Sequence, residues 1–195
     1  MKSLIIGFGY KAGRGKSLCQ QYTRELLNGY NLRSVKYCFA NTLKVGIGMT
    51  IFGLNSRQLW GDDKSIVDEY WGMTPRDILQ KAGTDAMRNV FGKDIWVKVA
   101  ERELKKHLDL NVACLIDDVR FPNEAELIHK YGGIVIRIDR VMPGNEADSH
   151  ESETAMDSYT KWDHVIANNG TKRDLKRSIR TIVTQLIIAN GGLKT

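Results

Sequence analysis

The sequence MKSLIIGFGYKAGRGKS at residues 1–17 joins an apolar strand candidate to a glycine-rich, basic loop that ends in Gly15-Lys16-Ser17. In such a loop, small residues let successive backbone N–H groups turn toward a phosphate. A lysine then meets the β- and γ-phosphates, a hydroxyl meets Mg²⁺, and the N-terminus of the next helix faces the anion. Residues 18–27 continue with a helical pattern. The stretch therefore predicts a nucleoside-triphosphate site at the end of the first strand.

The beginning of this loop departs from the G-x-x-x-x-G-K-[ST] spacing, because Tyr10 stands five residues before Gly15 and the nearest glycine is Gly9. Residues 7–12 also fit the dinucleotide pattern G-x-G-x-x-[GA]. That pattern expects a carboxylate after the second strand, whereas residues 34–39 run into Ala-Asn-Thr. A glycine turn with a purely structural role is a third interpretation. The motif and its context favour nucleoside triphosphate over both.

Composition limits the class of protein. With 195 residues, of which 42% are hydrophobic and 27% charged, the chain suits one α/β domain spanning residues 1–195. The formal net charge of +6 indicates anionic partners, either nucleotides or nucleic acid. Three widely spaced cysteines predict reduced core residues of a cytoplasmic protein. The apolar run at residues 4–8 is too short for a membrane segment, so no membrane partner is expected.

Apolar runs alternate with helical patterns along the chain. Strands are expected at residues 3–8, 34–39, 112–118, 134–139 and 164–167. Helices are expected at residues 16–28, 43–52, 75–90, 94–107, 122–131 and 173–189, with a polar connection at 53–74. This alternation predicts a three-layer α/β/α P-loop NTPase fold with a mostly parallel central sheet. Residues 141–161 form a candidate lid loop, for which an ordinary surface loop is the alternative.

Two acids, Asp117 and Asp118, end the strand at 112–118, and Arg120 follows them. In phosphate-loop enzymes a carboxylate at such a strand end organises Mg²⁺. Strand alternation predicts that the two acids point to opposite sides and that Asp118 shares its side with Arg120, so we expect this pair in the cleft. Ser17 and Asp117 are the expected metal ligands, although the sequence leaves open which of the two acids faces the metal. A solvated strand end is the alternative.

The helix at 75–90 places Arg76, Gln80 and Gly83-Thr84 on one face. Because a glycine inside a helix costs about 1 kcal/mol relative to alanine, Gly83 indicates close approach by a ligand or by another part of the chain. An exposed polar face with a helix–helix contact at Gly83 explains the same residues equally well. These two interpretations stay open at the level of the residues alone.

Several blocks together resemble the deoxynucleoside monophosphate kinases of tailed bacteriophages, and they recur in that family's order over nearly the whole chain. The blocks lie at residues 39–44, 52–54, 74–85, 94–96, 118–126, 150–153 and 168–170. The resemblance implies a P-loop nucleoside monophosphate kinase fold and transfer of the γ-phosphoryl group of ATP to a deoxynucleoside 5′-monophosphate with Mg²⁺. It also implies a location in the host cytoplasm if a phage encodes the chain.

The resemblance further implies roles for individual residues. Catalysis would rest on Lys16, Asp118 and Arg120. ATP phosphates would be bound by Lys11, Ala12, Gly13, Arg14, Gly15, Lys16 and Ser17. The acceptor nucleotide would be bound by Phe39, Ala40, Lys44, Arg76, Gln80, Gly83, Thr84, Trp96, Asp118 and Arg120. Ser17 stands where many members of the family carry Asp, so its contact with Mg²⁺ rests on the motif. From the sequence alone, Trp96 is more often a core residue than a wall for a nucleobase.

The proposed chemistry needs no general base, because the second pKa of a monophosphate is about 6 and the acceptor is mostly ionised at neutral pH. Arg14, Arg137 and Arg140 are further cations for phosphate charge. Two rivals remain: another small-molecule P-loop kinase, or a P-loop ATPase bound to nucleic acid. The second would use the basic stripe on the last helix, for which a solvated face is the alternative. Nucleic acid is therefore the less favoured partner, and a homodimer is left open.

Overall fold

The computed structural model describes residues 4–141 and 150–191. The chain groups into two compact units. Residues 1–37 and 101–195 form the first, here called the sheet unit, and residues 38–100 form the second, the helical unit. The single-domain organisation expected from chain length stays a prediction.

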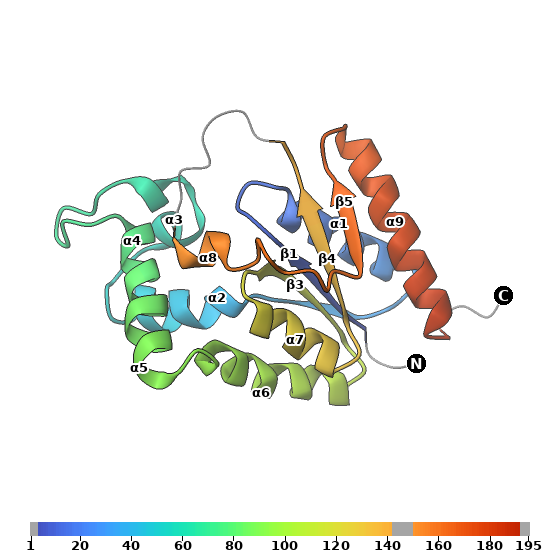
Figure 1. Cartoon of the computed structure of the whole chain (residues 1–195), viewed down its shortest axis with the longest axis horizontal. Coiled ribbons are helices and arrows are strands. Elements are labelled where there is room, and N and C mark those ends of the chain that lie inside the picture. The colour runs from blue at the N-terminus through green and yellow to red at the C-terminus, as the bar shows by residue number, and fades with distance from the viewer. Residues whose placement is uncertain (1–3, 142–149, 192–195) are drawn as a thin grey trace. The chain divides into compact units, whose positions relative to one another are not determined.

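The sheet unit contains a parallel sheet of five strands within the described residues (Figure 1). Its strands are β1 (Ile5–Gly9), β2 (Ser34–Tyr37), β3 (Ala113–Val119), β4 (Ile134–Asp139) and β5 (His164–Ala167), in the spatial order β2-β3-β1-β4-β5. β1 is central and pairs with β3 and β4. Every residue of β1 is buried, which explains why its sequence is continuously apolar rather than alternating. The predicted parallel sheet is confirmed.

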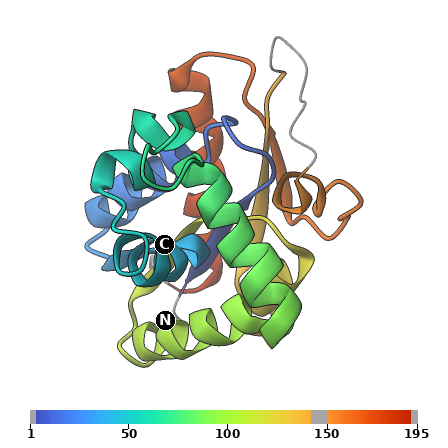
Figure 2. The ribbon, with the colours of Figure 1, turned by 90° about the vertical axis from the view of Figure 1, so that its left-hand side faces the viewer.

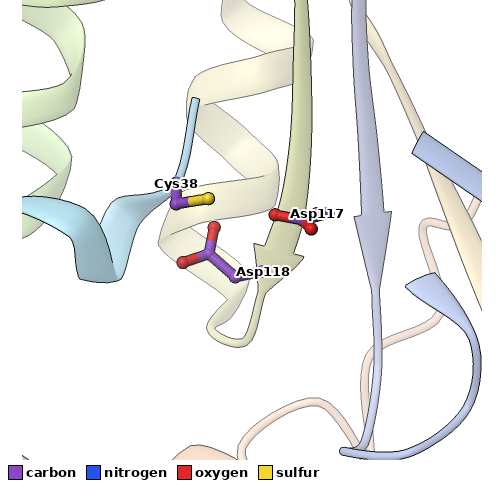
Figure 3. Close-up of side chains that lie close together, drawn as sticks. All are labelled: Cys38, Asp117 and Asp118. Carbon is purple, nitrogen blue, oxygen red and sulfur yellow. The ribbon is translucent and has the colours of Figure 1, made fainter. Parts of the chain in front are cut away.

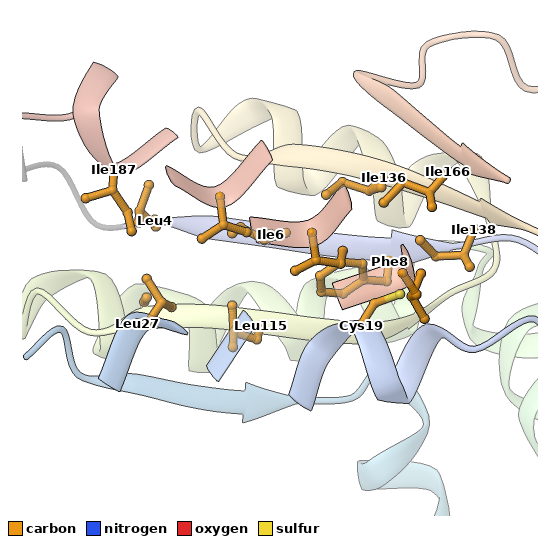
Figure 4. Packing of buried hydrophobic residues seen from close by; sticks show 14 residues of the cluster. Leu4, Ile6, Phe8, Cys19, Leu27, Leu115, Ile136, Ile138, Ile166 and Ile187 are labelled. Atoms are coloured by element: carbon orange, nitrogen blue, oxygen red, sulfur yellow. The ribbon is translucent and has the colours of Figure 1, made fainter. Parts of the chain in front are cut away.

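Helices lie on both faces of this sheet. On one face, α1 (Lys16–Gly29) and α9 (Lys172–Ala189) enclose the main core. Figure 4 shows Phe8 of β1 close to Cys19 of α1, and Leu4 close to Ile187 of α9. On the other face, α7 (Pro122–Lys130) packs so closely on β1 that a Cβ at Gly7 would lie 2.5 Å from Ile128 Cδ1. Helix α6 (Ile95–Asp109) runs beside α7, where Lys130 Nζ lies 2.8 Å from Glu101 Oε1.

The helical unit has its own small core of Leu54, Leu59 and Ile78. Its elements are α2 (Phe39–Thr42), η1 (Leu43–Met49), α3 (Ser56–Trp60), η2 (Asp62–Ser65), α4 (Pro75–Gln80), η3 (Lys81–Arg88) and α5 (Asn89–Phe91). Two of them, η1 and η3, are π-helices rather than α-helices. The run 75–91 is continuous and contains α4, η3 and α5 in turn (Figure 2, green).

The structure corrects four expected elements. The helix expected at 43–52 begins at Phe39 and is a π-helix from Leu43. The helix expected at 75–90 is α-helical only at its two ends. The connection at 53–74 contains α3, which begins with a capping box at Asn55. The candidate lid at 141–161 contains α8 (Glu151–Thr154), while its residues 142–149 lie outside the described part of the chain.

Candidate active site

The loop after β1 has the backbone that its glycines predict. Gly13 and Gly15 adopt positive φ angles of 71° and 99°, and Gly15 is the N-cap of α1, which begins at Lys16. A Cβ at Gly15 would lie 2.6 Å from Asn168 Nδ2. That same amide donates a hydrogen bond of 3.0 Å to the carbonyl oxygen of Arg14. Glycine is therefore required at position 15 both by conformation and by space.

Tyr10 explains how the loop forms without a glycine at its first position. Its φ of 95° is uncommon for a residue with a side chain. The ring is held by its neighbours: the Arg137 guanidinium lies 3.9 Å from the ring centroid, and Trp162 meets the ring edge-on at 6.4 Å between centroids. The backbone N–H of Tyr10 donates to the carbonyl oxygen of Val119 at the end of β3. Packing thus supports a backbone conformation that the motif assigns to glycine.

Lys16 lies buried at the first turn of α1, and 7% of it is exposed. Its Nζ donates to the carbonyl oxygen of Tyr10 at 2.8 Å and to that of Lys11. Burial, followed by repulsion from the nearby Arg120, lowers the pKa of Lys16 to about 7, whereas Glu153, Asp118 and Asp117 act in the opposite direction. The Lys16 amine therefore contacts the loop after β1 and interacts electrostatically with residues at the end of β3 and on α8.

Asp117 and Asp118 occupy different environments at the end of β3 (Figure 3). Asp117 is buried and accepts a 2.9 Å hydrogen bond from Lys36 Nζ on the neighbouring strand β2, while Asp118 is half-buried. Each has a carboxylate oxygen within 4.8 Å of an oxygen of the other. The pairing of β3 with β1 shifts register between Gly7 and Gly9. Regular alternation therefore does not extend to Arg120, and the argument that Asp118 and Arg120 share a side loses its premise.

Arg120 is held at both ends by glutamates. Its backbone N–H donates to Glu124 Oε2 at 2.8 Å, at the start of α7. Its guanidinium Nη1 pairs with Glu153 Oε1 on α8. The other oxygen of Glu153 accepts a 2.9 Å hydrogen bond from the backbone N–H of Ala12 in the phosphate loop. Arg120 and the loop are thus joined through one carboxylate within the sheet unit.

The expected acceptor residues other than Asp118 and Arg120 lie in the helical unit. Phe39 is buried at the start of α2, and Lys44 Nζ lies 5.6 Å from the ring centroid of Trp60. On the run 75–91, Arg76 is exposed, Gln80 is half-buried, and Gly83 with Thr84 is buried. The exposure of the residues on the predicted face therefore decreases along the run, from exposed at its N-terminal end to buried in η3.

Gly83 is explained by a contact within the helical unit. A Cβ at this position would lie 2.7 Å from Leu43 Cδ2 of η1, so its small size serves the contact between the two π-helices. Trp96 has 7% of its surface exposed, and its indole Nε1–H donates to the carbonyl oxygen of Gly83 at 2.9 Å. The helix–helix interpretation of Gly83 thus has a specific partner in the structure.

Comparison with known proteins identifies the family. The sequence profile of the deoxynucleotide monophosphate kinases matches residues 28–179. The chain belongs to the deoxynucleotide monophosphate kinase family. A protein of Acanthamoeba polyphaga mimivirus, provisionally named a deoxynucleotide monophosphate kinase, is 31% identical over 194 residues, which cover 92% of this chain and 96% of that protein. Deoxynucleoside-5′-monophosphate kinase of Escherichia phage T5 is 38% identical over 77 residues, which cover 40% of this chain and 30% of that protein.

The kinase also has the expected fold. APS kinase CysC of Mycobacterium tuberculosis, solved with AMPPNP and APS, aligns with a TM-score of 0.50 at 9% sequence identity, over 95% of this chain and 98% of that chain. A likeness at this identity concerns the fold alone. Together with the parallel sheet and its helices, it confirms the three-layer α/β/α P-loop fold. The chain is an enzyme that phosphorylates deoxynucleoside monophosphates, as the sequence predicted.

Some contacts of the kinase site were missed by sequence reasoning. Glu153, Lys36 and Asn168 received no role, although Glu153 and Asn168 lie in blocks quoted for the family resemblance. The structure shows them bonded to Ala12 and Arg120, to Asp117 and to Arg14, respectively. The sequence around Glu153 or Asn168 does not indicate that either residue bonds to the loop after β1. Only their presence in blocks shared with the family could have indicated it.

Other charged residues of the kinase lie outside the loop. Arg137 pairs with Asp139 at 2.7 Å, and the backbone N–H of Arg140 also donates to Asp139. On α9 the basic stripe is exposed and the opposite face is buried, as expected for a solvated face; Lys176 Nζ, for example, lies 2.9 Å from Glu25 Oε2. Across the described residues, none of the helices has the length and apolar character needed to cross a membrane.

Proposed function

We propose that this kinase transfers the γ-phosphoryl group of ATP to the phosphate of a deoxynucleoside 5′-monophosphate and that Mg²⁺ assists the transfer. The observation that supports the donor most directly is the loop after β1. Its two glycines with positive φ lead into the N-terminus of α1, and Lys16 begins that helix. Backbone N–H groups and a helix N-terminus suit the phosphates of a nucleotide. The donor residues would be Lys11, Ala12, Gly13, Arg14, Gly15, Lys16 and Ser17.

Lys16 would provide the positive charge at the β- and γ-phosphates. In the ligand-free protein its Nζ bonds to two loop carbonyl oxygens, and burial keeps its pKa at about 7. Phosphate oxygens would replace neutral carbonyls by anions, which favours the protonated amine. Binding of ATP above pH 7 would therefore be accompanied by proton uptake at Lys16.

The end of β3 fits a hard divalent cation, because Asp117 and Asp118 offer carboxylate oxygens within 4.8 Å of each other. Ser17 and Asp117 would hold Mg²⁺, with Asp118 as the alternative ligand. When bound, Mg²⁺ supplies neutralisation of phosphate charge. We expect Asp118→Asn to lower kcat more than Asp117→Asn, because the carboxylate of Asp117 is already paired with Lys36. An equal or larger loss at Asp117 would show that Asp118 is not the more important of the two acids for turnover.

The acceptor would be held mainly by residues of the helical unit: Phe39, Ala40, Lys44, Arg76, Gln80, Gly83, Thr84 and Trp96, together with Asp118 and Arg120. Its phosphate carries about two negative charges near neutral pH, since the second pKa is about 6. The reaction then requires positioning and charge neutralisation rather than proton abstraction by a base. Lys16 and Arg120 would carry out that neutralisation.

The test is a screen of the common deoxynucleoside and ribonucleoside monophosphates with MgATP, in which ADP and nucleoside diphosphate are both quantified. We expect diphosphate and ADP in equal amounts with at least one deoxynucleoside monophosphate, and no turnover after chelation of Mg²⁺. Addition of DNA should not stimulate ATP hydrolysis. Hydrolysis that responds to DNA and to no monophosphate would contradict the proposal and favour an ATPase bound to nucleic acid.

A further inference from the structure

Glu153 is an acidic side chain that reaches the phosphate loop from far along the chain. It lies on α8, 141 residues after Ala12, and its side chain is 9% exposed. A carboxylate buried to this extent needs partners that compensate for its lost hydration. Two such partners are the backbone of the phosphate loop and the side chain of Arg120. Under the proposed function, both must be positioned accurately for the reaction.

The two oxygens of Glu153 make different contacts. Oε2 accepts the N–H of Ala12 at 2.9 Å, and Oε1 pairs with Nη1 of Arg120. Ala12 follows β1 and Arg120 follows β3, and these strands are neighbours in the sheet. The carboxylate therefore links the ends of two adjacent strands. Because the Arg120 backbone is separately fixed by Glu124, Glu153 determines the direction of the guanidinium.

The segment that carries Glu153 is itself fastened to the sheet unit. His150 Nδ1 accepts from the backbone N–H of Ser152 and so caps α8. Beyond the helix, Asp157 lies 3.3 Å from Lys11 Nζ, and Met156 and Tyr159 are buried. The position of the carboxylate thus depends on a capped turn and on packing rather than on one ion pair.

We propose that Glu153 is a positioning residue for phosphoryl transfer, which holds the Arg120 guanidinium beside the phosphate loop so that it faces the transferred group. This inference rests on the proposed function. A guanidinium has five N–H donors in a fixed plane, so pairing at one end leaves donors for phosphate oxygens at the other. The contact uses the N–H of Ala12, whereas the first turn of α1 lies four residues farther along, at Lys16. Glu153 can therefore keep the N–H of Ala12 while phosphates bind the other residues of the loop and the helix N-terminus.

The same carboxylate balances charge between two cations. Arg120 lowers the pKa of Lys16, and Glu153 raises it. The carboxylate thus offsets part of the repulsion between Arg120 and Lys16.

The test compares Glu153→Gln with Glu151→Gln, an exposed residue of the same helix. The amide oxygen of Gln can still accept from Ala12, but the charge that orients Arg120 is lost. We expect Glu153→Gln to lower kcat roughly 10- to 100-fold, the scale for a displaced reacting group. KM for MgATP and for the acceptor should change less than about threefold, so that the loss appears in kcat rather than in KM. Glu151→Gln should behave as wild type.

A double-variant cycle with Arg120→Ala completes the test. If Glu153 acts through Arg120, adding Glu153→Gln to Arg120→Ala should lower kcat little further. Additive losses would overturn the proposal, and so would an unchanged kcat in Glu153→Gln. Tighter MgATP binding without loss of kcat would also overturn it, since the carboxylate would then compete with phosphate. Lack of turnover by the wild type would instead contradict the proposed function.

Discussion

Two helical segments of this kinase both begin with α-helical turns and then differ. Helix α1 begins after Gly15 and stays α-helical, with Cys19, Thr23 and Leu27 buried at intervals of four. The run 75–91 begins as a regular α-helix capped by Thr74, but it becomes a π-helix from Lys81 to Arg88. The residues of the phosphate loop thus precede a helix whose faces can be read from sequence. Several proposed acceptor residues lie on a run whose faces cannot be read in this way.

The departure from α geometry has local causes in the structure. Gly83 gives Leu43 room at a distance that any Cβ would obstruct, and its carbonyl oxygen receives the indole N–H of Trp96. In a π-helix the backbone bonds are i→i+5, and such segments are frequent at functional sites. Contacts from residues outside the run therefore accompany the change from α- to π-helix. The helix propensities of the residues within the run do not reveal these contacts.

The largest expected effect breaks the α1 side of this comparison. Lys16→Ala removes the point charge at the β- and γ-phosphates, and we expect kcat to fall roughly a hundredfold or more, the scale for losing a transition-state electrostatic contact. Lys172→Ala on α9, an exposed residue, is the control and should keep wild-type turnover. Near-normal turnover of a folded Lys16→Ala at saturating MgATP would show that the loop does not bind the donor phosphates.

A smaller effect is expected at the start of the run 75–91. Arg76 is exposed on α4 and is our candidate for the acceptor phosphate. Arg76→Ala should lower kcat/KM for the acceptor by about 30-fold, equivalent to about 2 kcal/mol, with MgATP affinity nearly unchanged. Arg57→Ala, on α3 of the same unit, removes an exposed arginine paired with Asp63 and should have no such effect. Equal losses in the two variants would point to general charge attraction.

The third prediction tests the π-helix directly. Trp96→Phe keeps a large ring but leaves the Gly83 carbonyl without its indole donor, which should cost about 1 kcal/mol of unfolding free energy. We expect KM for the acceptor to rise a few-fold while kcat at saturation changes little. Trp71→Phe is a close control, because Trp71 Nε1 donates to the Phe52 carbonyl oxygen at 2.9 Å, away from the run. If both variants change KM equally, the bond to Gly83 does not support the acceptor site.

These contrasts show what sequence could supply. The order of strands and helices along the chain, the parallel sheet and the phosphate loop followed from apolar periodicity and from Gly15-Lys16-Ser17, because these signals are local. The bounds of β4 and β5 were predicted to the residue. The shift of register between β1 and β3 was not predicted, because it depends on how neighbouring strands pair. The alternation argument at Asp117 and Asp118 assumed a regular strand, and this assumption does not hold at the register shift, so the choice between the two acids stays a prediction.

The site residues divide in the same way. Lys16 could be proposed from the sequence because it belongs to a short motif with a known spacing. Glu153 was not, since its bond partners lie more than 30 residues away along the chain. The π-helical segments were missed because an apolar pattern at α spacing is also compatible with a local insertion of one residue per turn. Tyr10 was noticed only as a departure, and its ring contacts explain why the departure is tolerated.

The last prediction concerns stability and pH rather than turnover, and it sharpens the contrast between a buried lysine at the start of α1 and an exposed one on η3. Burial lowers the pKa of Lys16 from 10.5 to about 7, so between these values the unfolded chain binds more protons at this site than the folded protein. The unfolding free energy therefore rises with pH in this window, and the folded state is penalised as the pH falls toward 7.

Lys16→Met removes this dependence. Urea unfolding of ligand-free protein should show Lys16→Met more stable than wild type at pH 7, with the difference shrinking by pH 9 to 10. Lys81→Met, at an exposed position of η3, should show no such trend. The stability difference between wild type and Lys16→Met could instead stay constant from pH 7 to pH 10. That result would mean that folding does not lower the pKa of Lys16, and the contrast between the start of α1 and the run 75–91 would then not extend to this lysine.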